Sequence, residues 1–321
     1  MNNYIGIDVS SQTLQVYDGK KNVEVPNSEK LLELRRLLQD AFPKDWKKVR
    51  LLYEPTGVYS SYVEQFALRF SIQAYAINPK RSSNFAKALG NRSKTDPIDA
   101  KMLYEYHKLV AESEWKVPEI DKDLDSIIHN LSTYEFIQMS RVQMGNHLHA
   151  LKRGKTVDAA SVEFLEKEID RLKKQEEAMV IAMEKKTKAY ETTKEDFARL
   201  TSIPGIGPLS AIVLLMMFRR YPETNRAEMT ALMGLDPIRR TSGTTLHKKD
   251  RISKEGNHFV RKILYMGTVS SIRHDNRIKV YYDHLIDNNK PPKVALIACM
   301  RKLVLIAHQL YTKKEYYKAN L

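Results

Sequence analysis

The chain has 321 residues, of which 42% are hydrophobic and 29% charged, and its formal net charge is +14. This length allows two or three domains with sizeable cores, and the composition is ordinary for a soluble protein, which argues against a disordered or membrane-embedded chain. The single cysteine, Cys299, excludes an intrachain disulfide or a cysteine-based zinc site, and its apolar neighbours predict a buried thiol.

The first 80 residues predict an α/β domain. Short runs rich in β-branched and aromatic residues alternate with segments that carry a helical apolar stripe. We expect strands at 4–9, 13–17, 22–26, 49–53 and 72–77, and helices at 29–41 and 59–70. A strand meander followed by alternating strands and helices is the order of an RNase H-like domain, although periodicity alone indicates only α/β.

Two carboxylates lie in or at the ends of these predicted strands. Asp8 interrupts the first apolar strand, and desolvating a carboxylate there costs several kcal/mol unless a partner compensates. Glu54 ends the strand at 49–53, because Pro55 and Gly57 stop it. The plainer interpretation of Asp8 is a solvent-facing residue on an edge strand.

Two further carboxylates, Asp96 and Asp99, lie at a predicted helix start. Thr95 or Asp96 would cap this helix with Pro97 at its first position, so both acids would share one face of the first turn. Four carboxylates in one α/β unit can hold two Mg²⁺ (or Mn²⁺) ions for in-line phosphoryl transfer. The plainer alternatives are an N-cap at Asp96 and a dipole-stabilised acid at Asp99.

Two long helices are predicted next. Apolar residues at spacings of three and four run from Leu124 to Leu151 and again from Val162 to Met183, with a break at Gly154. Helices of about 30 residues would each extend about 45 Å, and we expect an antiparallel hairpin or coiled coil. Its apolar seam suggests a dimer contact or a spacer, and local packing of the two helices is the nearly equal alternative.

The basic excess belongs to the last third of the chain, where 22 Lys and Arg face 9 Asp and Glu between Arg199 and Leu321. This asymmetry favours a polyanion partner, nucleic acid before membrane. The stretch 200–211 matches a helix-hairpin-helix pattern, in which Gly205 and Gly207 would expose backbone N–H groups to a DNA phosphate. The alternative is a tight turn between helices.

A polar loop is predicted over 239–245. Ser242 precedes a glycine amid basic residues, which favours a nucleophilic role more than for an ordinary surface hydroxyl. The basic residues that we expect to contact phosphates here are Arg239, Arg240, Lys248, Lys249, Arg251, Lys254, Arg261 and Lys262.

Targeting signals are not evident. The amino-terminal stretch has neither a basic start nor an apolar core, so we expect no signal peptide. Arg301 and Lys302 interrupt the apolar run near residue 300, so we expect no membrane span and a cytoplasmic location.

Six motifs, in their order and spacing, resemble the DEDD-type transposases of the IS110 family, bridge-RNA-guided recombinases of bacterial insertion sequences. They are YIGIDVS, YEPTGVY, NRSKTDPIDA, SIPGIG, RRTSGT and ISKEGNHFVRKILY. The resemblance implies a fold of class α/β plus α. Its parts are a RuvC-like (RNase H fold) domain over 1–115, a helical coiled-coil segment over 116–196, and a mainly helical, basic transposase domain with the helix-hairpin-helix-like motif over 197–321.

The resemblance also implies a mechanism. Asp8, Glu54, Asp96 and Asp99 would bind the metal, and Ser242 would attack DNA to form a serine–DNA ester. The ester conserves the bond energy, so no nucleotide cofactor is needed, consistent with the lack of a Walker-type loop in the sequence. The implied partners are double-stranded DNA, a structured guide RNA and further copies of the chain, as a homodimer or homotetramer.

Two other classes of function remain open. A RuvC-like structure-specific nuclease or a Piv-type DNA invertase would use the four acids without an RNA. A non-catalytic nucleic-acid-binding scaffold would use only the basic third of the chain, with the acids serving as caps. RNA of defined sequence that copurifies with the protein would favour the guided recombinase.

Overall fold

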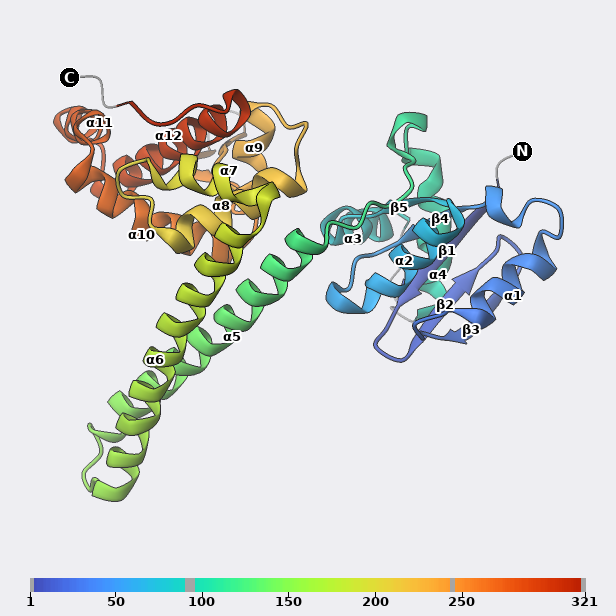
Figure 1. The fold of residues 1–321 in the computed structure, drawn as a ribbon, viewed down its shortest axis with the longest axis horizontal. Coiled ribbons are helices and arrows are strands. Elements are labelled where there is room, and N and C mark those ends of the chain that lie inside the picture. Colours follow the sequence, from blue (N-terminus) through green and yellow to red (C-terminus); the bar gives the residue numbers. More distant parts are fainter. Residues whose placement is uncertain (1–2, 90–95, 243–245, 319–321) are drawn as a thin grey trace. The chain divides into compact units, whose positions relative to one another are not determined.

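The computed structural model describes residues 3–89, 96–242 and 246–318. The chain forms two compact units, Met1–Ile120 and Asp121–Leu321 (Figure 1). The border between them lies close to the predicted end of the first domain at residue 115. The helical segment predicted at 116–196 packs together with the carboxy-terminal helices in one unit.

The first unit is built on a five-stranded sheet with the order β3-β2-β1-β4-β5. The strands are β1 (Tyr4–Val9), β2 (Thr13–Tyr17), β3 (Asn22–Pro26), β4 (Arg50–Tyr53) and β5 (Gln73–Ala76). The central strand β1 pairs antiparallel with β2 and parallel with β4. All five predicted strands are confirmed, and the mixed sheet is consistent with the RNase H-like domain that the strand order predicted.

Helices cover both faces of this sheet. On one face, Ile5 and Ile7 pack in a core with α1 (Leu32–Ala41) and α2 (Ser61–Phe70). On the other face, α4 (Asp96–Glu105) lies against β1 and β2. A Cβ atom at Gly6 would lie 2.1 Å from the carbonyl oxygen of Ala100 in α4, so the close approach of α4 to β1 requires glycine at that position.

One helix of this unit, α3 (Pro79–Ala88), has no predicted counterpart. The Asn78 side chain accepts a hydrogen bond from the backbone N–H of Lys80 at 2.9 Å, and Pro79 occupies the first helical position. Both features stabilise a helix start, which the prediction treated only as the end of a strand. Short 3₁₀ turns complete the unit at Trp46–Lys48, Gly57–Ser60, Tyr106–Leu109 and Glu112–Glu114.

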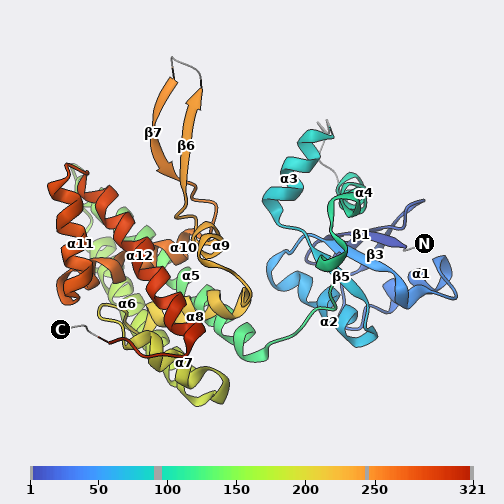
Figure 2. The ribbon, with the colours of Figure 1, turned by 90° about the horizontal axis from the view of Figure 1, so that it is seen from above.

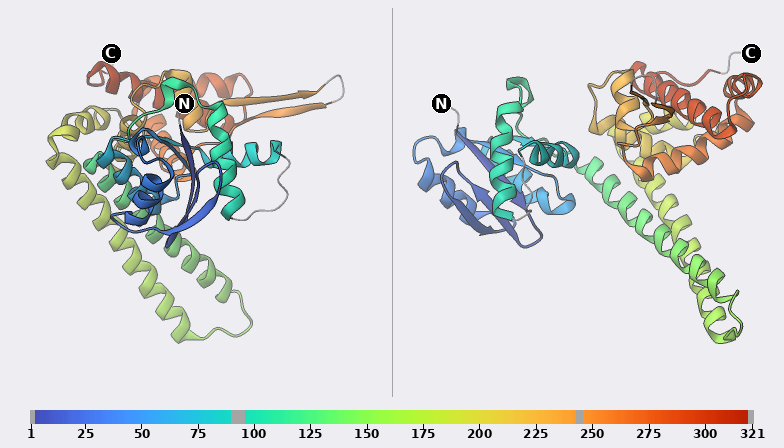
Figure 3. Two further views of the ribbon diagram at one scale, coloured as in Figure 1. Left: turned by 90° about the vertical axis from the view of Figure 1, so that its right-hand side faces the viewer. Right: turned by 180° about the vertical axis from the view of Figure 1, so that it is seen from behind.

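The second unit begins with a long antiparallel hairpin, α5 (Lys122–Leu151) and α6 (Ala159–Ala189) (Figure 3). Leu172 of the predicted seam is buried, and the buried Glu176 pairs with Arg141 of α5, Nε to Oε1 at 2.5 Å. These contacts show that the seam packs within the chain, as the local alternative expects, and the predicted dimer contact stays a prediction. Phe136 on α5 stays 72% exposed.

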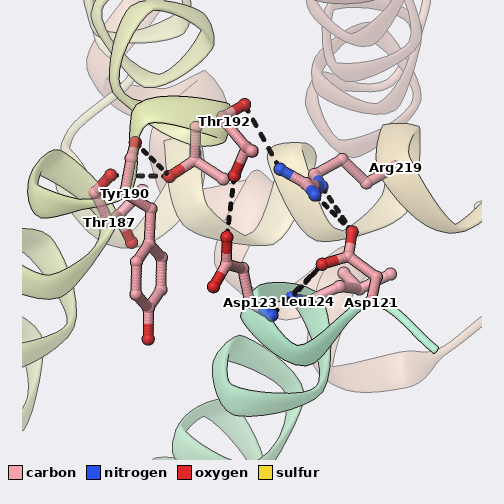
Figure 4. A network of polar contacts seen from close by, with 8 residues as sticks. Asp121, Asp123, Leu124, Thr187, Tyr190, Thr192 and Arg219 are labelled. Atoms are coloured by element: carbon pink, nitrogen blue, oxygen red, sulfur yellow. Dashed lines mark hydrogen bonds and ion pairs between the residues drawn. The ribbon is translucent and has the colours of Figure 1, made fainter.

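A polar network fixes the base of the hairpin (Figure 4). The Asp121 carboxylate caps α5 and accepts from Nε of Arg219 at 2.9 Å, while Arg219 also donates to the Thr192 carbonyl at 3.2 Å. The Thr192 hydroxyl donates to Asp123 at 2.8 Å. Partial burial opposes ionisation of Asp121, but the N–H of Leu124 and the Arg219 guanidinium outweigh it and lower the pKa of Asp121. The hairpin is thereby joined to the helices that follow.

The remaining helices pack around the buried α8. They are α7 (Glu191–Thr201), α8 (Pro208–Arg220), α9 (Arg226–Leu232), α10 (His258–His274), α11 (Asn276–Asp287) and α12 (Pro292–Lys313). By length and composition alone α12 would suffice to cross a membrane, with 39% of its apolar window buried in the structure. It contributes Met300 and Leu303 to the core of this unit. Cys299 is fully buried, as predicted, and burial raises the pKa of its thiol to about 11.

A β-hairpin takes the place of the predicted polar loop. Strands β6 (Pro237–Ser242) and β7 (Leu246–Ile252) pair antiparallel and project from the helices of the second unit (Figure 2). The loop prediction was wrong for 239–242, while 243–245 lie outside the described residues. The charged residues of this stretch masked its strand character, because backbone pairing forms a ladder whatever the side chains carry.

Candidate active site

The pairing of β1 and β4 brings two of the four predicted acids together. Ile7 of β1 lies opposite Tyr53 of β4, so Asp8 and Glu54 are the next residues on the two parallel chains. Side chains in register on neighbouring strands leave the same face, about 4.8 Å apart along the hydrogen-bonding direction. Because β1 is the central strand, the edge-strand alternative for Asp8 is excluded.

The direction of α4 brings its start toward Asp8. Tyr4, at the beginning of β1, stacks on His107 just beyond the end of α4, with ring centroids 4.1 Å apart. Gly6 contacts Ala100 in the first half of the helix. The helix therefore runs antiparallel to the strand, and Asp8, the next residue on the same face, is directed toward its first turn.

Asp96 and Asp99 lie in that first turn, as predicted, because α4 begins at Asp96. Asp99 is half-buried, and the side chain of Asp96 lies outside the described residues. Within the side chains that the structure describes, no three His, Cys, Asp or Glu residues form a group that could hold a metal ion. The carboxylates nonetheless fit a hard divalent cation in their chemistry, since all of them offer oxygen ligands.

A polar side chain that the sequence analysis missed ties the ends of the two strands together. The Asn27 amide donates to the carbonyl of Ser10 at 2.8 Å and to the carbonyl of Tyr59 at 3.0 Å. Ser10 follows Asp8 closely on the chain and Tyr59 follows Glu54, so one amide holds both segments that flank the acids. No local pattern in the sequence singles out Asn27.

A second missed residue, Ser82 of α3, contacts the site directly. Its hydroxyl donates to Oε2 of Glu54 at 2.6 Å. Ser82 is only 2% exposed. Glu54 itself is half-buried. Because α3 was not predicted, this contact could not be expected from the sequence.

The predicted helix-hairpin-helix turn between α7 and α8 is partly closed by packing. Gly205 has a φ of +87°, and a Cβ there would lie 2.3 Å from the backbone nitrogen of Ser271 in α10. The Ser271 hydroxyl donates to the carbonyl of Pro204 at 2.7 Å. Gly205 thus packs against another helix, as the tight-turn alternative expects, whereas a Cβ at Gly207 would meet no atom within 4 Å.

Two of the basic residues predicted to contact phosphates donate hydrogen bonds within the protein: the half-buried Arg261 and the exposed Lys262. Nη1 of Arg261 donates to the carbonyls of Gly256 at 2.5 Å and Met233 at 3.3 Å, and burial lowers the pKa of this guanidinium. Lys262 donates to Gln138 of α5 at 2.5 Å. Arg261 therefore holds the base of the β-hairpin through backbone carbonyls, and Lys262 ties α10 to α5. The predicted phosphate contacts of Arg261 and Lys262 stay predictions.

The β-hairpin itself concentrates positive charge. Residues 237–254 contain six Lys and Arg and one acid, Asp250. Ser242 is the last residue of β6 and lies opposite Leu246 in the pairing. Arg251 and Lys254 are exposed. The side chains that lie outside the described residues include those of Arg239, Arg240, Ser242, Lys248 and Lys249.

Two sequence models of transposases match this chain. Residues 5–151 match a DEDD transposase model of IS110 type, and residues 197–283 match the model of the IS116/IS110/IS902 transposase family. The chain belongs to the IS110 family of transposases. It is therefore a DNA transposase or recombinase, as its motifs predicted, and the DEDD-type domain indicates use of a divalent metal.

Relatives of this transposase include proteins named for gene inversion as well as proteins named as transposases. The pilin gene-inverting protein of Moraxella lacunata is 24% identical over 316 residues, which cover 95% of this chain and 94% of that protein. A putative transposase, y4pF/y4sB of Sinorhizobium fredii, is 24% identical over 98% of this chain and 85% of its own length. The transposase for insertion sequence element IS1111A of Coxiella burnetii is 29% identical over 42% of this chain and 38% of its own length.

Proposed function

We propose that this transposase cuts and exchanges strands of double-stranded DNA through a serine–DNA ester, with a divalent cation bound by Asp8, Glu54, Asp96 and Asp99. The observation that carries the proposal is the register of β1 and β4, in which Asp8 and Glu54 are adjacent on the face covered by α4. Ionised carboxylates this close repel one another, and a bound cation relieves that repulsion. The domain that contains the acids matches the DEDD transposase model.

The carboxylates would hold the cation where the parallel strands β1 and β4 end. Mg²⁺ and Mn²⁺ fit this role, because both are bound well by carboxylate and water oxygens. When bound, such an ion polarises a phosphoryl oxygen and stabilises the charge that develops in phosphoryl transfer.

Ser242 acts as the nucleophile. Its Oγ forms a bond to phosphorus while the bond from phosphorus to the 3′ oxygen breaks; the serine proton passes to a base, and the departing 3′ oxygen takes up a proton. A 3′-hydroxyl of the exchanged strand then attacks the ester and releases the serine. One ester bond replaces another at each step, so no nucleotide cofactor is consumed. The cationic residues around Ser242 support this role, since they would stabilise the developing phosphate charge.

A guide RNA selects the DNA sites in this proposal, while the protein binds phosphate backbones and assembles as a homodimer or homotetramer. Base pairing between RNA and DNA reads the sequence, so the protein needs no surface for contacts to base edges. Its basic residues are then left to bind the phosphate backbones. We expect a structured RNA of defined sequence to copurify with the protein, and a change in its pairing segment to redirect strand exchange. Sequencing the copurified RNA and assaying exchange on matched and mismatched target DNA tests this.

A second candidate is an RNA-independent DNA invertase. It is favoured by the near full-length match to the pilin gene-inverting proteins. Strand exchange that persists unchanged after complete RNase digestion would select the invertase and exclude RNA guidance.

The β-hairpin supplies cations for phosphate binding in either case. Removing one cation that neutralises a phosphate should reduce the slope of log affinity against log salt by about 0.9 for duplex DNA. We therefore expect Gln at Lys248, Lys249, Arg251 and Lys254 together to reduce the slope by about 3 to 4, as measured by fluorescence anisotropy.

A matched control removes the same charge elsewhere in the second unit. Gln at the exposed Lys155, Lys174, Lys185 and Lys194 lowers the net charge equally without touching the β-hairpin. Equal slopes for the two variants would assign the effect to net charge and remove the hairpin from the DNA interface.

A further inference from the structure

We infer that Ser82 is a positioning residue for Glu54, and that its hydroxyl occupies carboxylate oxygen Oε2 so that Oε1 is the oxygen offered to a cation. This inference rests on the proposed metal role of Glu54. It assigns a function to α3, an element to which neither the motifs nor the family match gives a role.

The contact itself has the features of a strong hydrogen bond. Ser82 Oγ lies 2.6 Å from Oε2 of Glu54 and 2.9 Å from the carbonyl oxygen of Pro79. A hydroxyl has one proton, and an ionised carboxylate is the stronger acceptor of the two. With Ser82 only 2% exposed, water does not compete for this hydroxyl. The bond to Glu54 is therefore the one that the buried site favours.

Ser82 and Glu54 differ in how firmly the surrounding backbone holds each side chain. Ser82 lies in the first turn of α3, and its N–H donates to the carbonyl of Asn78 at 3.0 Å. On the inner side of the same helix, Phe85 packs edge-on against Tyr106 at 5.2 Å. Glu54 instead follows the last residue of β4 and precedes a loop in which Gly57 has a φ of +58°. The helix thus supplies the rigid group and the strand end supplies the carboxylate that it orients.

The consequence concerns how Glu54 binds a cation. A carboxylate with one oxygen held by a hydroxyl presents the other as a single ligand, and Mg²⁺ demands near-ideal octahedral geometry, usually from one or two carboxylates plus waters. Partners that orient a ligand typically change metal affinity about 10- to 100-fold when removed. Without Ser82, the Glu54 side chain would sample rotamers in which neither oxygen is aimed at the site.

The test is a titration with Mg²⁺ alone, in which the melting temperature of the full chain is measured at each Mg²⁺ concentration. Binding to the folded state raises the melting temperature once the Mg²⁺ concentration approaches the dissociation constant, so the concentration at which the rise begins reports affinity without any activity measurement. We expect Ser82→Ala to shift this onset to about 10- to 100-fold higher Mg²⁺ concentration, and Ser82→Thr, which keeps the hydroxyl, to reverse most of the shift. Ser83→Ala, an exposed neighbour on the same helix, should titrate as wild type.

Glu54→Gln separates this inference from the proposed function. If Glu54→Gln weakens the Mg²⁺ response while Ser82→Ala titrates as wild type, Glu54 remains a ligand and the role of Ser82 is overturned. If Glu54→Gln itself titrates as wild type, the metal role of Glu54 fails and the inference fails with it. A Ser82→Ala protein that melts lower by the same amount at every Mg²⁺ concentration, with an unchanged onset of the rise, would show a purely structural role and would also overturn the inference.

Discussion

Protein carrying Asp8→Asn should fold and bind DNA but exchange strands at least about 1,000-fold more slowly than wild type. The amide keeps the shape of the side chain and removes its charge, so the cation loses a ligand. Metal stabilisation of transition-state charge amounts to several kcal/mol, and each 1.4 kcal/mol is about tenfold in rate. Glu54→Gln should behave alike, because Glu54 is the neighbour of Asp8 across the parallel strands.

Gel assays of strand exchange with purified protein measure this effect, and melting curves without metal check the fold. Glu33→Gln is the matched control, since it makes the same chemical change at an exposed position of α1, on a helix that packs on the opposite face of the sheet. Full exchange in excess EDTA, or by the Asp8→Asn protein, would remove the carboxylates from the mechanism.

Ser242→Ala should abolish the covalent protein–DNA adduct while leaving DNA affinity within about twofold of wild type. Removing a catalytic nucleophile commonly costs about 10⁶-fold in rate, whereas one hydroxyl contributes little to an affinity that many cations share. End-labelled DNA that migrates with the protein on a denaturing gel measures the adduct, and anisotropy measures the affinity.

Thr241→Ala is the neighbouring control on β6, because it removes a hydroxyl one residue earlier on the same strand. It should retain the adduct. An adduct formed at wild-type yield by the Ser242→Ala protein would exclude this serine, and loss of the adduct in both variants would point to damage to the hairpin instead.

Much of the first unit follows from local pattern. The strands at 4–9 and 49–53 could be predicted because an apolar run and its breakers lie within a few residues of each other. The same local rules located Asp8 within a strand and Glu54 at a strand end, and the Asp-Pro start located α4. Family motifs then connected these positions to one chemistry, which the two transposase models confirm at the level of the family.

Contacts between distant segments could not be predicted in this way. Ser82 meets Glu54 across 28 residues and Asn27 meets Tyr59 across 32. Serine and asparagine are common polar residues, so nothing in their own neighbourhood marks them. Only the packing of α3 and the closing of the sheet bring their side chains to these partners.

In the basic last third of the chain, the partner of each charged side chain could not be predicted from the sequence either. Composition correctly indicates an excess of cations, but a lysine or arginine in the sequence does not state its partner. Arg261 carries the same charge as Arg251, yet Arg261 is half-buried and donates to two backbone carbonyls, while Arg251 stays exposed. Burial decides this difference, and burial is a property of the folded chain.

The sequence by itself therefore determined the family, the five strands of the first unit, and the positions of the four acids along the chain. The tertiary structure alone decided that Asp8 and Glu54 are neighbours, that Gly205 and Arg261 serve packing, and that β6 and β7 form a hairpin. The physical reason is the distance along the sequence over which each kind of interaction acts. Periodicity, caps and turn residues act over a few positions, whereas strand register, burial and side-chain hydrogen bonds depend on which distant segments pack together.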